Sequence, residues 1–326
     1  MRVLVTGAFG FIGLNLVEAL LARGDTVIAA DLGGPPEAAR RALAARGTGL
    51  SAVAGDVRDE RFMQTLVAAY RPDALVHAAA LTPGPATERS RMTSAVDVNV
   101  NGTLRALEAA AGHGCARVLF LSSGAVYGAA GLTASLLDER DTPPAPGTLY
   151  PITKLAAERL ALRLGELAGL DVVAARVGAA FGPWEADTGA RDTLSPHFQL
   201  VRHARRGIEA VLPRRSALDW NYSRDAAAAL LVLLDRPAAE RVVNVGPGFA
   251  LDLERFCEAL AASFPRFRWR YGDEAEATID LHAPRDRAPL AVDRLRAAGF
   301  APRFDERGAY ADYVAWLEAH DAGVSI

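Results

Sequence analysis

Tyr150 and Lys154 are the residues whose types and spacing most directly suggest chemistry. Four positions apart, they would lie on one face of a helix, and Pro151 suits the first turn of that helix. A nearby ammonium group favours the phenolate, so we expect Lys154 to lower the pKa of Tyr150 toward neutrality. A phenol tuned in this way can take the proton of a hydroxyl group while a hydride leaves the same carbon.

Two serines, Ser122 and Ser123, end the apolar segment "RVLFLSS" (117–123), which we predict to be a strand. The carboxyl end of a parallel strand faces the crevice where ligands bind. A hydroxyl group at that place can donate a hydrogen bond to a substrate oxygen. We therefore expect both serines to lie beside the substrate.

Three glycines in "LVTGAFGFIG" (4–13) stand between a predicted strand and a predicted helix. Such a turn lets backbone N–H groups approach a pyrophosphate, and the N-terminus of the helix adds its partial positive charge. The residues that we expect to bind cofactor phosphates are Gly7, Gly10, Phe11, Ile12 and Gly13.

Asp31 ends the second predicted strand, 18 residues after Gly13. A carboxylate at this distance accepts hydrogen bonds from the ribose hydroxyls of an adenosine, and it would repel a 2′-phosphate. The next residues, Leu32, Gly33 and Gly34, include no arginine that could hold such a phosphate. The sequence therefore favours NAD over NADP as the cofactor.

The elements that must position these residues alternate along the first half of the chain. We predict strands at 2–7, 26–31, 50–56, 74–80, 117–123 and 171–176, and helices at 11–24, 36–47, 59–71, 95–114 and 151–169. Apolar strands alternating with amphipathic helices indicate an α/β fold, a doubly wound parallel sheet of the Rossmann type.

Prolines interrupt shorter elements after residue 176, which indicates a second, smaller α/β domain. We predict a cofactor-binding Rossmann domain at 1–176 and a substrate-binding domain at 177–326. Part of the second region, about 218–246, is expected to pack back on the first.

Composition excludes several classes of protein. With 51% hydrophobic residues, 23% charged residues and a formal net charge of −3, the chain can form a sizeable core and has no general attraction for nucleic acid or anionic membranes. No apolar run is long enough to span a bilayer, and the two cysteines and six histidines show no metal-ligand spacing. We expect a cytoplasmic protein without a metal, a nucleic-acid partner or a membrane partner.

Further motifs follow in a fixed order: "GDVRD" (55–59), "VHAAA" (76–80), "DVNVNGT" (97–103), "SSGAVYG" (122–128) and "YPITK" (150–154). With the glycine turn and Asp31, they make the chain resemble an extended short-chain dehydrogenase/reductase of the NAD-dependent epimerase/dehydratase family. The resemblance covers the whole chain.

This resemblance implies roles for particular residues. Ser123, Tyr150 and Lys154 would be catalytic, with Lys154 also holding the nicotinamide ribose. The remaining cofactor contacts that it implies are Asp56 and Val57 at the adenine, Ala78, Ala79 and Ala80 along the cofactor, and Asn99 as support from its helix. It also implies a homodimer formed through the helices at 95–113 and 151–169.

The sequence departs from the family pattern at three places. The 4,6-dehydratases carry an Asp-Glu pair after the catalytic hydroxyl residue, where this chain has Gly124 and Ala125, so dehydration is disfavoured. Nucleotide-sugar epimerases usually have an asparagine at the place of Ala179 and an arginine at the place of Leu218. Since both of those groups contact the substrate, a smaller sugar, sugar acid or lactone becomes a candidate.

Two polar loops, 82–91 and 182–198, are expected to cover the substrate. The residues that we predict to contact it are Thr82, Ser122, Ser123, Arg191, His197 and Arg285.

Two enzymatic hypotheses remain open. One is an NAD-dependent sugar epimerase, which oxidises a carbinol and reduces the ketone on its other face. The other is an NAD-dependent dehydrogenase of a sugar, sugar acid or lactone precursor without a nucleotide. A catalytically silent NAD-sensing scaffold is a third hypothesis, against which the intact Ser123, Tyr150 and Lys154 argue.

Overall fold

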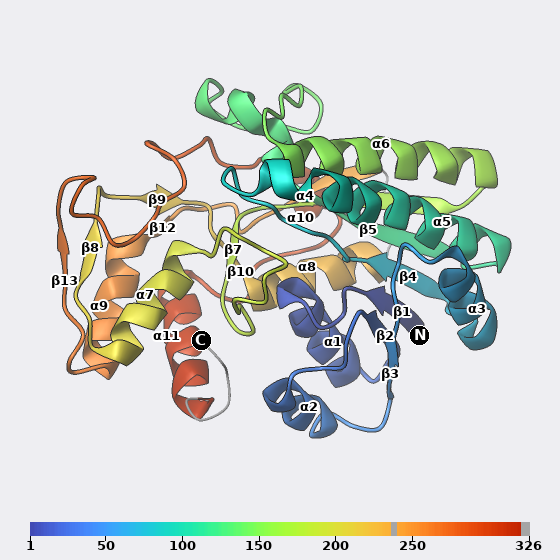
Figure 1. The fold of residues 1–326 in the computed structure, drawn as a ribbon, viewed down its shortest axis with the longest axis horizontal. Helices are drawn as coiled ribbons and strands as arrows, with labels where there is room; N and C mark the ends of the chain where they lie inside the picture. The colour runs from blue at the N-terminus through green and yellow to red at the C-terminus, as the bar shows by residue number, and fades with distance from the viewer. Residues whose placement is uncertain (236–239, 321–326) are drawn as a thin grey trace.

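A seven-stranded parallel sheet forms the centre of the computed structural model, which describes residues 1–235 and 240–320 (Figure 1). The strand order is β11-β6-β5-β4-β1-β2-β3, and every neighbouring pair is parallel. The strands are β1 (Arg2–Thr6), β2 (Thr26–Asp31), β3 (Leu50–Ala54), β4 (Ala74–His77), β5 (Arg117–Ser123), β6 (Asp171–Val177) and β11 (Val242–Val245). The strand order reverses between β1 and β4. A ligand is therefore expected in the crevice at the carboxyl ends of these two strands.

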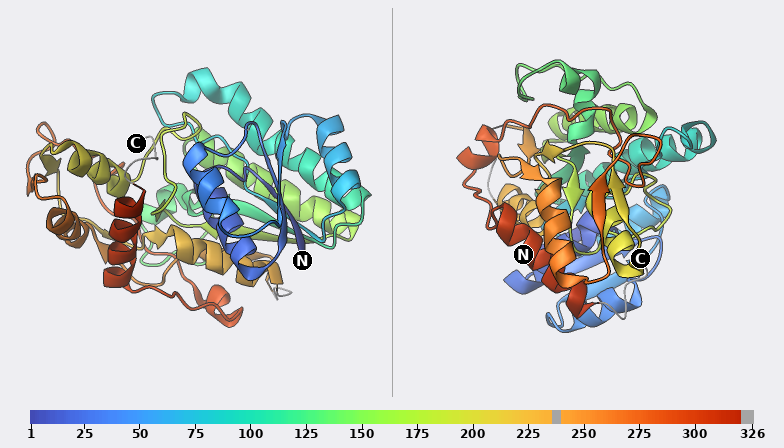
Figure 2. Two further views of the ribbon diagram at one scale, coloured as in Figure 1. Left: turned by 90° about the horizontal axis from the view of Figure 1, so that it is seen from below. Right: turned by 90° about the vertical axis from the view of Figure 1, so that its left-hand side faces the viewer.

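Helices cover both faces of this sheet (Figures 1 and 2). One face carries α3 (Glu60–Tyr70), α5 (Gly102–Gly112) and α6 (Leu149–Ala168), and the other carries α1 (Phe11–Arg23), α2 (Glu37–Ala44) and α8 (Ser223–Asp235). Alternate residues of β1 serve the two cores, because Val3 and Val5 pack in the same cluster as Leu20 of α1, whereas Leu4 packs in that of Ala157 of α6. The predicted doubly wound fold is confirmed.

The predicted helix at 95–114 begins earlier than its pattern suggested. It consists of α4 (Glu88–Val96), a π-helical turn η1 (Asp97–Asn101) and α5. The predicted loop 82–91 therefore ends in a helix, because a turn from Gly84 to Thr87 starts α4 within it.

A second group of elements gathers at one end of the molecule, on the left of Figure 1. It contains α7 (Pro196–Arg206), α9 (Leu253–Ser263), α11 (Glu306–Ala319) and two of the three two-stranded pairs, whereas the first of the pairs named next lies toward the middle of the molecule, against α8. The pairs are β7 (Ala180–Phe181) with β10 (Asn221–Tyr222), β8 (Ala210–Leu212) with β13 (Trp269–Tyr271), and β9 (Ala217–Leu218) with β12 (Leu251–Asp252). Between these elements the chain returns to the sheet through α8 and β11; the domain boundary at residue 176 stays a prediction.

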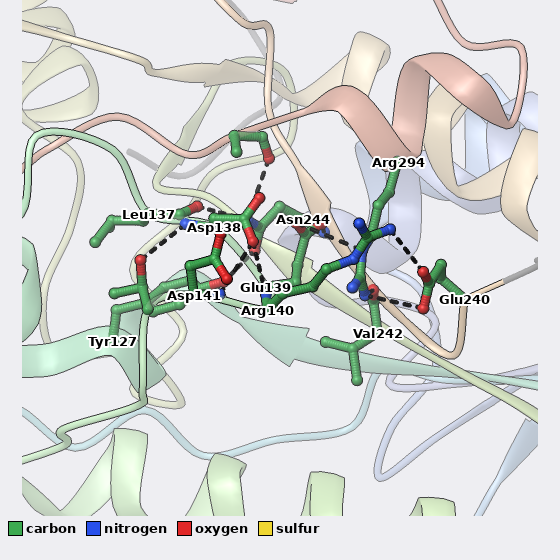
Figure 3. Close-up of polar contacts among 12 residues, drawn as sticks. Tyr127, Leu137, Asp138, Glu139, Arg140, Asp141, Glu240, Val242, Asn244 and Arg294 are labelled. Atoms are coloured by element: carbon green, nitrogen blue, oxygen red, sulfur yellow. Dashed lines mark hydrogen bonds and ion pairs between the residues drawn. The ribbon is translucent and has the colours of Figure 1, made fainter.

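Asn244 of β11, the edge strand beside β6, forms hydrogen bonds with three segments that are distant in the sequence (Figure 3). Its Nδ2 donates to the carbonyl oxygens of Leu137 at 2.9 Å and Ala291 at 3.1 Å, and its Oδ1 accepts from the Tyr127 hydroxyl at 3.0 Å. Its backbone N–H donates to Glu139 Oε1 at 2.7 Å. The segment after η2 (Gly124–Leu132) and the segment before α10 (Asp293–Ala297) are thus both anchored on β11.

Within the described ranges, no helix combines the length and apolar character needed to cross a membrane.

Candidate active site

The turn after β1 can be built only with glycine at two positions. Gly7 has a φ of +66°, and a Cβ atom there would lie 2.6 Å from the Ala79 backbone nitrogen. A Cβ atom at Gly13 would lie 2.1 Å from the Gly7 carbonyl oxygen. Gly7 thus brings β1 close to the end of β4, and Gly13 lets α1 pack on the turn.

The N-terminus of α1 is suited to an anion. Gly10 is its N-cap, and no side chain among residues 1–235 and 240–320 caps it. The first N–H groups of a helix lack partners within the helix, and at α1 these belong to residues such as Phe11 and Ile12. This cradle fits a pyrophosphate, as the sequence predicts.

Asp31 lies at the neighbouring strand end. Its carboxylate accepts hydrogen bonds from the backbone nitrogens of Phe9 and Leu32, both at 2.8 Å. These two contacts fix its position, and a carboxylate can accept about four hydrogen bonds, so acceptor capacity remains for ribose hydroxyls.

The next two predicted cofactor residues differ in exposure. The carboxylate of Asp56 is paired with Arg58, with Oδ2 and Nη2 2.6 Å apart, and this contact holds the pKa of Asp56 below its ordinary value. Val57 is buried in the core. Their predicted contact with an adenine stays a prediction.

Asn99 uses its side chain to position the segment that follows β4. Its Oδ1 accepts from the Leu81 nitrogen at 2.8 Å, and its Nδ2 donates to the Leu81 carbonyl and to Thr153 Oγ1, both at 2.9 Å. The side chain therefore joins the residues just after Ala78–Ala80 to α6. Asn99 acts on the site through this connection.

Tyr150 is the centre at which the predicted catalytic residues meet. Ser123 at the end of β5, Arg191, and Thr82 of the segment after β4 are the neighbours that act on the pKa of its phenol. Burial raises the pKa of Tyr150, while these three neighbours lower it. The net direction is upward.

The expected effect of Lys154 on Tyr150 is therefore not observed. The cation that acts on the phenol is Arg191, from a loop of the second half of the chain, and the pKa of Tyr150 is raised because burial outweighs it. Spacing alone could not show which groups surround the phenol.

Lys154 is buried one helical turn along α6, with its Nζ 4.4 Å from the centre of the Phe120 ring. Burial lowers the pKa of Lys154 to about 7, against the opposing effect of Glu158. Burial lowers the pKa of the neighbouring His77 to about 3, and the charge of Lys154 is a second cause. The His77 ring is therefore neutral, and its Nδ1 is hydrogen-bonded with Thr6 Oγ1 at 2.7 Å.

The loops after β4 and β7 are joined beside Tyr150. Thr82 and Arg191 form a parallel bridge, in which the Thr82 nitrogen donates to the Ala190 carbonyl at 2.8 Å and the Asp192 nitrogen to the Thr82 carbonyl at 3.1 Å. Arg191 Nη1 lies 3.3 Å from Glu185 Oε1, and its guanidinium lies 5.8 Å from the centre of the Phe11 ring. The two predicted substrate residues Thr82 and Arg191 are thus brought together.

Ser122 is directed away from Tyr150. Neighbouring residues of a strand point to opposite faces, and the Ser122 hydroxyl donates to buried Glu158 at 2.6 Å. The substrate contact predicted for Ser122 is therefore wrong, because its hydroxyl is used inside the protein.

His197 is also a core residue. Its ring stacks on Phe181 with centroids 4.0 Å apart and is fully buried, so the pKa of His197 lies well below its ordinary value. The substrate contact predicted for His197 is wrong, because Pro196 starts α7 and turns the next side chain into the aromatic core.

Arg285 lies on an exposed segment and donates to the Leu132 carbonyl at 3.0 Å. Its predicted substrate contact stays a prediction.

Glu158 and Arg176 are a buried pair of charged residues that the sequence interpretation missed. Glu158 stands four residues after Lys154, as Lys154 does after Tyr150, so the same helical spacing could have pointed to it.

Comparison with known proteins decides the family. The family model described as "NAD dependent epimerase/dehydratase family" matches residues 3–246. The chain belongs to this family. The predicted resemblance is thereby confirmed, and NAD is the cofactor that the family uses.

Relatives in the family carry out different reactions. The chain is 29% identical to dTDP-glucose 4,6-dehydratase of an Actinoplanes species, over 98% of both chains, and 26% identical to a probable UDP-glucuronate 4-epimerase of Rhizobium meliloti, over 82% and 83%. Its structure is similar to that of Thermus thermophilus UDP-glucose 4-epimerase in complex with NAD, with a TM-score of 0.77, 25% identity and coverage of 98% and 99%. Family membership therefore leaves the reaction and the substrate to be inferred from the site.

Among the described residues, no group of three or more His, Cys, Asp or Glu side chains is placed to hold a metal ion.

Proposed function

We propose that the protein is an NAD-dependent sugar epimerase. The observation that carries this proposal is the position of Tyr150, whose phenol is influenced by Ser123 and Thr82 from the carboxyl ends of β5 and β4. Bound NAD would supply the hydride acceptor for oxidation of the substrate carbinol and the hydride donor for reduction of the ketone.

The chain's own residues supply the proton chemistry. Tyr150 would take the hydroxyl proton and give it back, and Ser123 would hydrogen-bond the same substrate oxygen. Lys154 would hold the nicotinamide ribose from its buried position below Tyr150. Gly7, Gly13 and the N-terminus of α1 would hold the pyrophosphate.

The joined loops favour an epimerase over a dehydrogenase. An epimerase must keep its ketone until reduction, and the bridge between Thr82 and Arg191 ties the loops of both halves of the chain beside Tyr150. A net dehydrogenase has to release its ketone or lactone at each turnover.

Dehydration is disfavoured by the residues that follow Ser123. Elimination of water needs an acid beside the reacting carbons, and Gly124 and Ala125 have no functional side chains. The Ala125 nitrogen instead donates to Ser123 Oγ at 3.1 Å. A dehydratase of the kind named among the relatives would lack its acid here.

Arg191 supports a sugar that carries a carboxylate. Its positive charge acts on the Tyr150 phenol, so a substrate placed at Tyr150 would meet that charge as well. An arginine binds a carboxylate in a planar, two-bond geometry. We therefore include sugar acids among the proposed substrates.

The alternative is an NAD-dependent dehydrogenase of a sugar acid or lactone precursor without a nucleotide, and a specific observation favours it. Ala179 and Leu218 stand where many nucleotide-sugar enzymes have polar groups. Arg214 could replace them only by leaving its contacts with Asp286 Oδ1 at 2.8 Å and the Ala283 carbonyl at 3.0 Å.

One assay separates these reactions. Purified protein is given NAD and a panel of UDP-sugars, UDP-sugar acids, free sugars and free sugar acids. NADH is followed by absorbance and products by NMR. We expect an inverted stereocentre without accumulation of NADH. NADH formed in proportion to substrate would establish the dehydrogenase, and a 4-keto-6-deoxy product would establish a dehydratase.

We further propose a homodimer through α6 and the helix pair α4–α5. Exposed apolar side chains on these helices include Met92, Val96, Ile152 and Leu160, and a second copy would bury them. Light scattering of the purified protein is expected to give twice the chain mass, and Leu160→Glu is expected to lower it.

A further inference from the structure

Lys154 is the single lysine of the chain, although the sequence contains 36 lysines and arginines together. All the others are arginines, and an arginine keeps its charge at any pH that proteins experience. A lysine is a compact charge whose pKa shifts when it is buried. Among the lysines and arginines of the chain, Lys154 is therefore the one whose charge its surroundings can adjust.

The surroundings of Lys154 work against that charge. The side chain is 2% exposed, and its Nζ lies over the Phe120 ring. The charged and titratable groups around it include His77 from β4, which is neutral, and Glu158 and Tyr150 from α6 itself, one helical turn to either side of Lys154. Glu158 lies one helical turn along α6, on the same face.

Glu158 is fully buried and held from two strands. Arg176 of β6 donates to it through Nη2 at 2.7 Å and Nε at 3.0 Å, and Ser122 of β5 donates at 2.6 Å. Arg176 is fixed in turn by the Tyr127 ring of η2, whose centre lies 4.9 Å from the guanidinium carbon.

This arrangement is costly if stability is its only purpose. Removing two charges from water offsets much of their mutual attraction, so a buried ion pair is weak evidence for a stabilising role. The position of the pair, between Lys154 and the strand end that carries Ser123, indicates another use.

We propose that Glu158 is a positioning residue: its carboxylate keeps Lys154 charged, and through Ser122 it fixes the end of β5 that presents Ser123. What Lys154 then does for the reaction rests on the proposed function. Arg176 and Ser122 hold the carboxylate in place, so that it faces Lys154 in one orientation.

The single lysine makes a direct test possible. Lysine labelled with ¹³C at the ε carbon gives one side-chain NMR resonance in the full-length chain, and its shift with pH reports the charge on Lys154. We expect the wild-type protein to titrate near neutrality and Glu158→Gln to titrate about one pH unit lower, because an attractive charge is lost.

Ser122→Ala is the matched control. It removes a hydrogen bond to the same carboxylate but keeps the charge, so the Lys154 titration is expected to stay in place while turnover falls equally at all pH values. In Glu158→Gln the alkaline side of the pH–activity profile is expected to move down with the Lys154 titration. Equal Lys154 titrations in Glu158→Gln and wild type would overturn the proposal.

Glu158→Gln leaves Arg176 buried without its carboxylate. If that variant does not fold, Glu158→Gln with Arg176→Met removes both charges of the pair. We expect the same downward shift, since Glu158 is the charge that acts on Lys154. A wild-type titration in the double variant would again overturn the proposal. The NMR experiment needs no substrate, so its outcome is independent of whether the proposed epimerase activity is found.

Discussion

Thr82 and Arg191, 109 positions apart in the sequence, are direct neighbours in a parallel β-bridge. Thr82 follows β4 of the central sheet, and Arg191 lies between β7 and α7. The side chains of both residues act on the Tyr150 phenol. The two halves of the chain therefore complete one site.

Replacing Tyr150 tests the catalytic assignment. We expect Tyr150→Phe to lower turnover by roughly 10²–10⁴-fold, the usual contribution of a positioned acid/base, with NAD affinity and melting temperature nearly unchanged. Turnover is measured by NMR and NAD binding by calorimetry. Near-normal turnover would show that another group moves the proton.

Asp31 is expected to set the choice of cofactor. Wild-type protein should bind NAD more tightly than NADP, because the carboxylate repels a 2′-phosphate. Asp31→Ala should weaken the binding of NAD and strengthen the binding of NADP. The difference between the two affinities, measured by calorimetry, should therefore become smaller. A wild-type preference for NADP would contradict this role.

Gly7 is expected to tolerate no side chain. In Gly7→Ala the added Cβ would meet the Ala79 backbone at 2.6 Å, in a conformation with φ of +66°. A strained backbone of this kind costs about 1–3 kcal/mol, so the melting temperature and NAD affinity should both fall. Gly33→Ala is the control, since its Cβ would meet no described atom within 4 Å. If Gly7→Ala and Gly33→Ala changed the melting temperature and the NAD affinity equally, a steric clash at Gly7 would not be the cause.

Arg191 is expected to act on both the substrate and the pKa of Tyr150. Its charge lowers the pKa of the phenol, so Arg191→Met should raise that pKa and move the acid side of the pH–activity profile upward. For a sugar acid, KM should also rise, by about 10-fold or more, because a charge-assisted bond is lost.

Arg202→Met, on α7, is the control for Arg191→Met. Arg202 is paired with Asp187 at 3.8 Å and is not among the groups that act on Tyr150. The same change in KM for acidic and neutral sugars after Arg191→Met would exclude a carboxylate contact.

Asp192 is expected to keep the two loops together. Its Oδ2 accepts hydrogen bonds from the Gly84 nitrogen at 3.0 Å and from the Thr87 hydroxyl, and the latter contact lowers the pKa of Asp192. A lowered carboxylate pKa means that this contribution is present at neutral pH and is lost as the pH falls through that pKa.

Asp192→Ala tests this contribution. In an epimerase the variant should release ketone and NADH, both of which the wild-type protein keeps, and the measurement is NADH absorbance per epimer formed. An unchanged ratio would show that the loops are held by the backbone bridge alone.

The sequence by itself determined the sheet, the glycine turn and the helix of Tyr150 and Lys154. These features depend on local physics: apolar strands alternate with helices, glycine alone reaches a φ of +66° without strain, and residues four apart share a helical face. The motifs then sufficed to place the chain in its family.

Only the tertiary structure decided which side chains face Tyr150. Ser122 and Ser123 are chemically identical neighbours, and the pleat of β5 sends one to Glu158 and the other to the phenol. Arg191 and His197 lie in one predicted loop, yet one acts on Tyr150 and the other is buried against Phe181. Burial and long-range contacts made these distinctions, and neither is encoded in the spacing of residues along the chain.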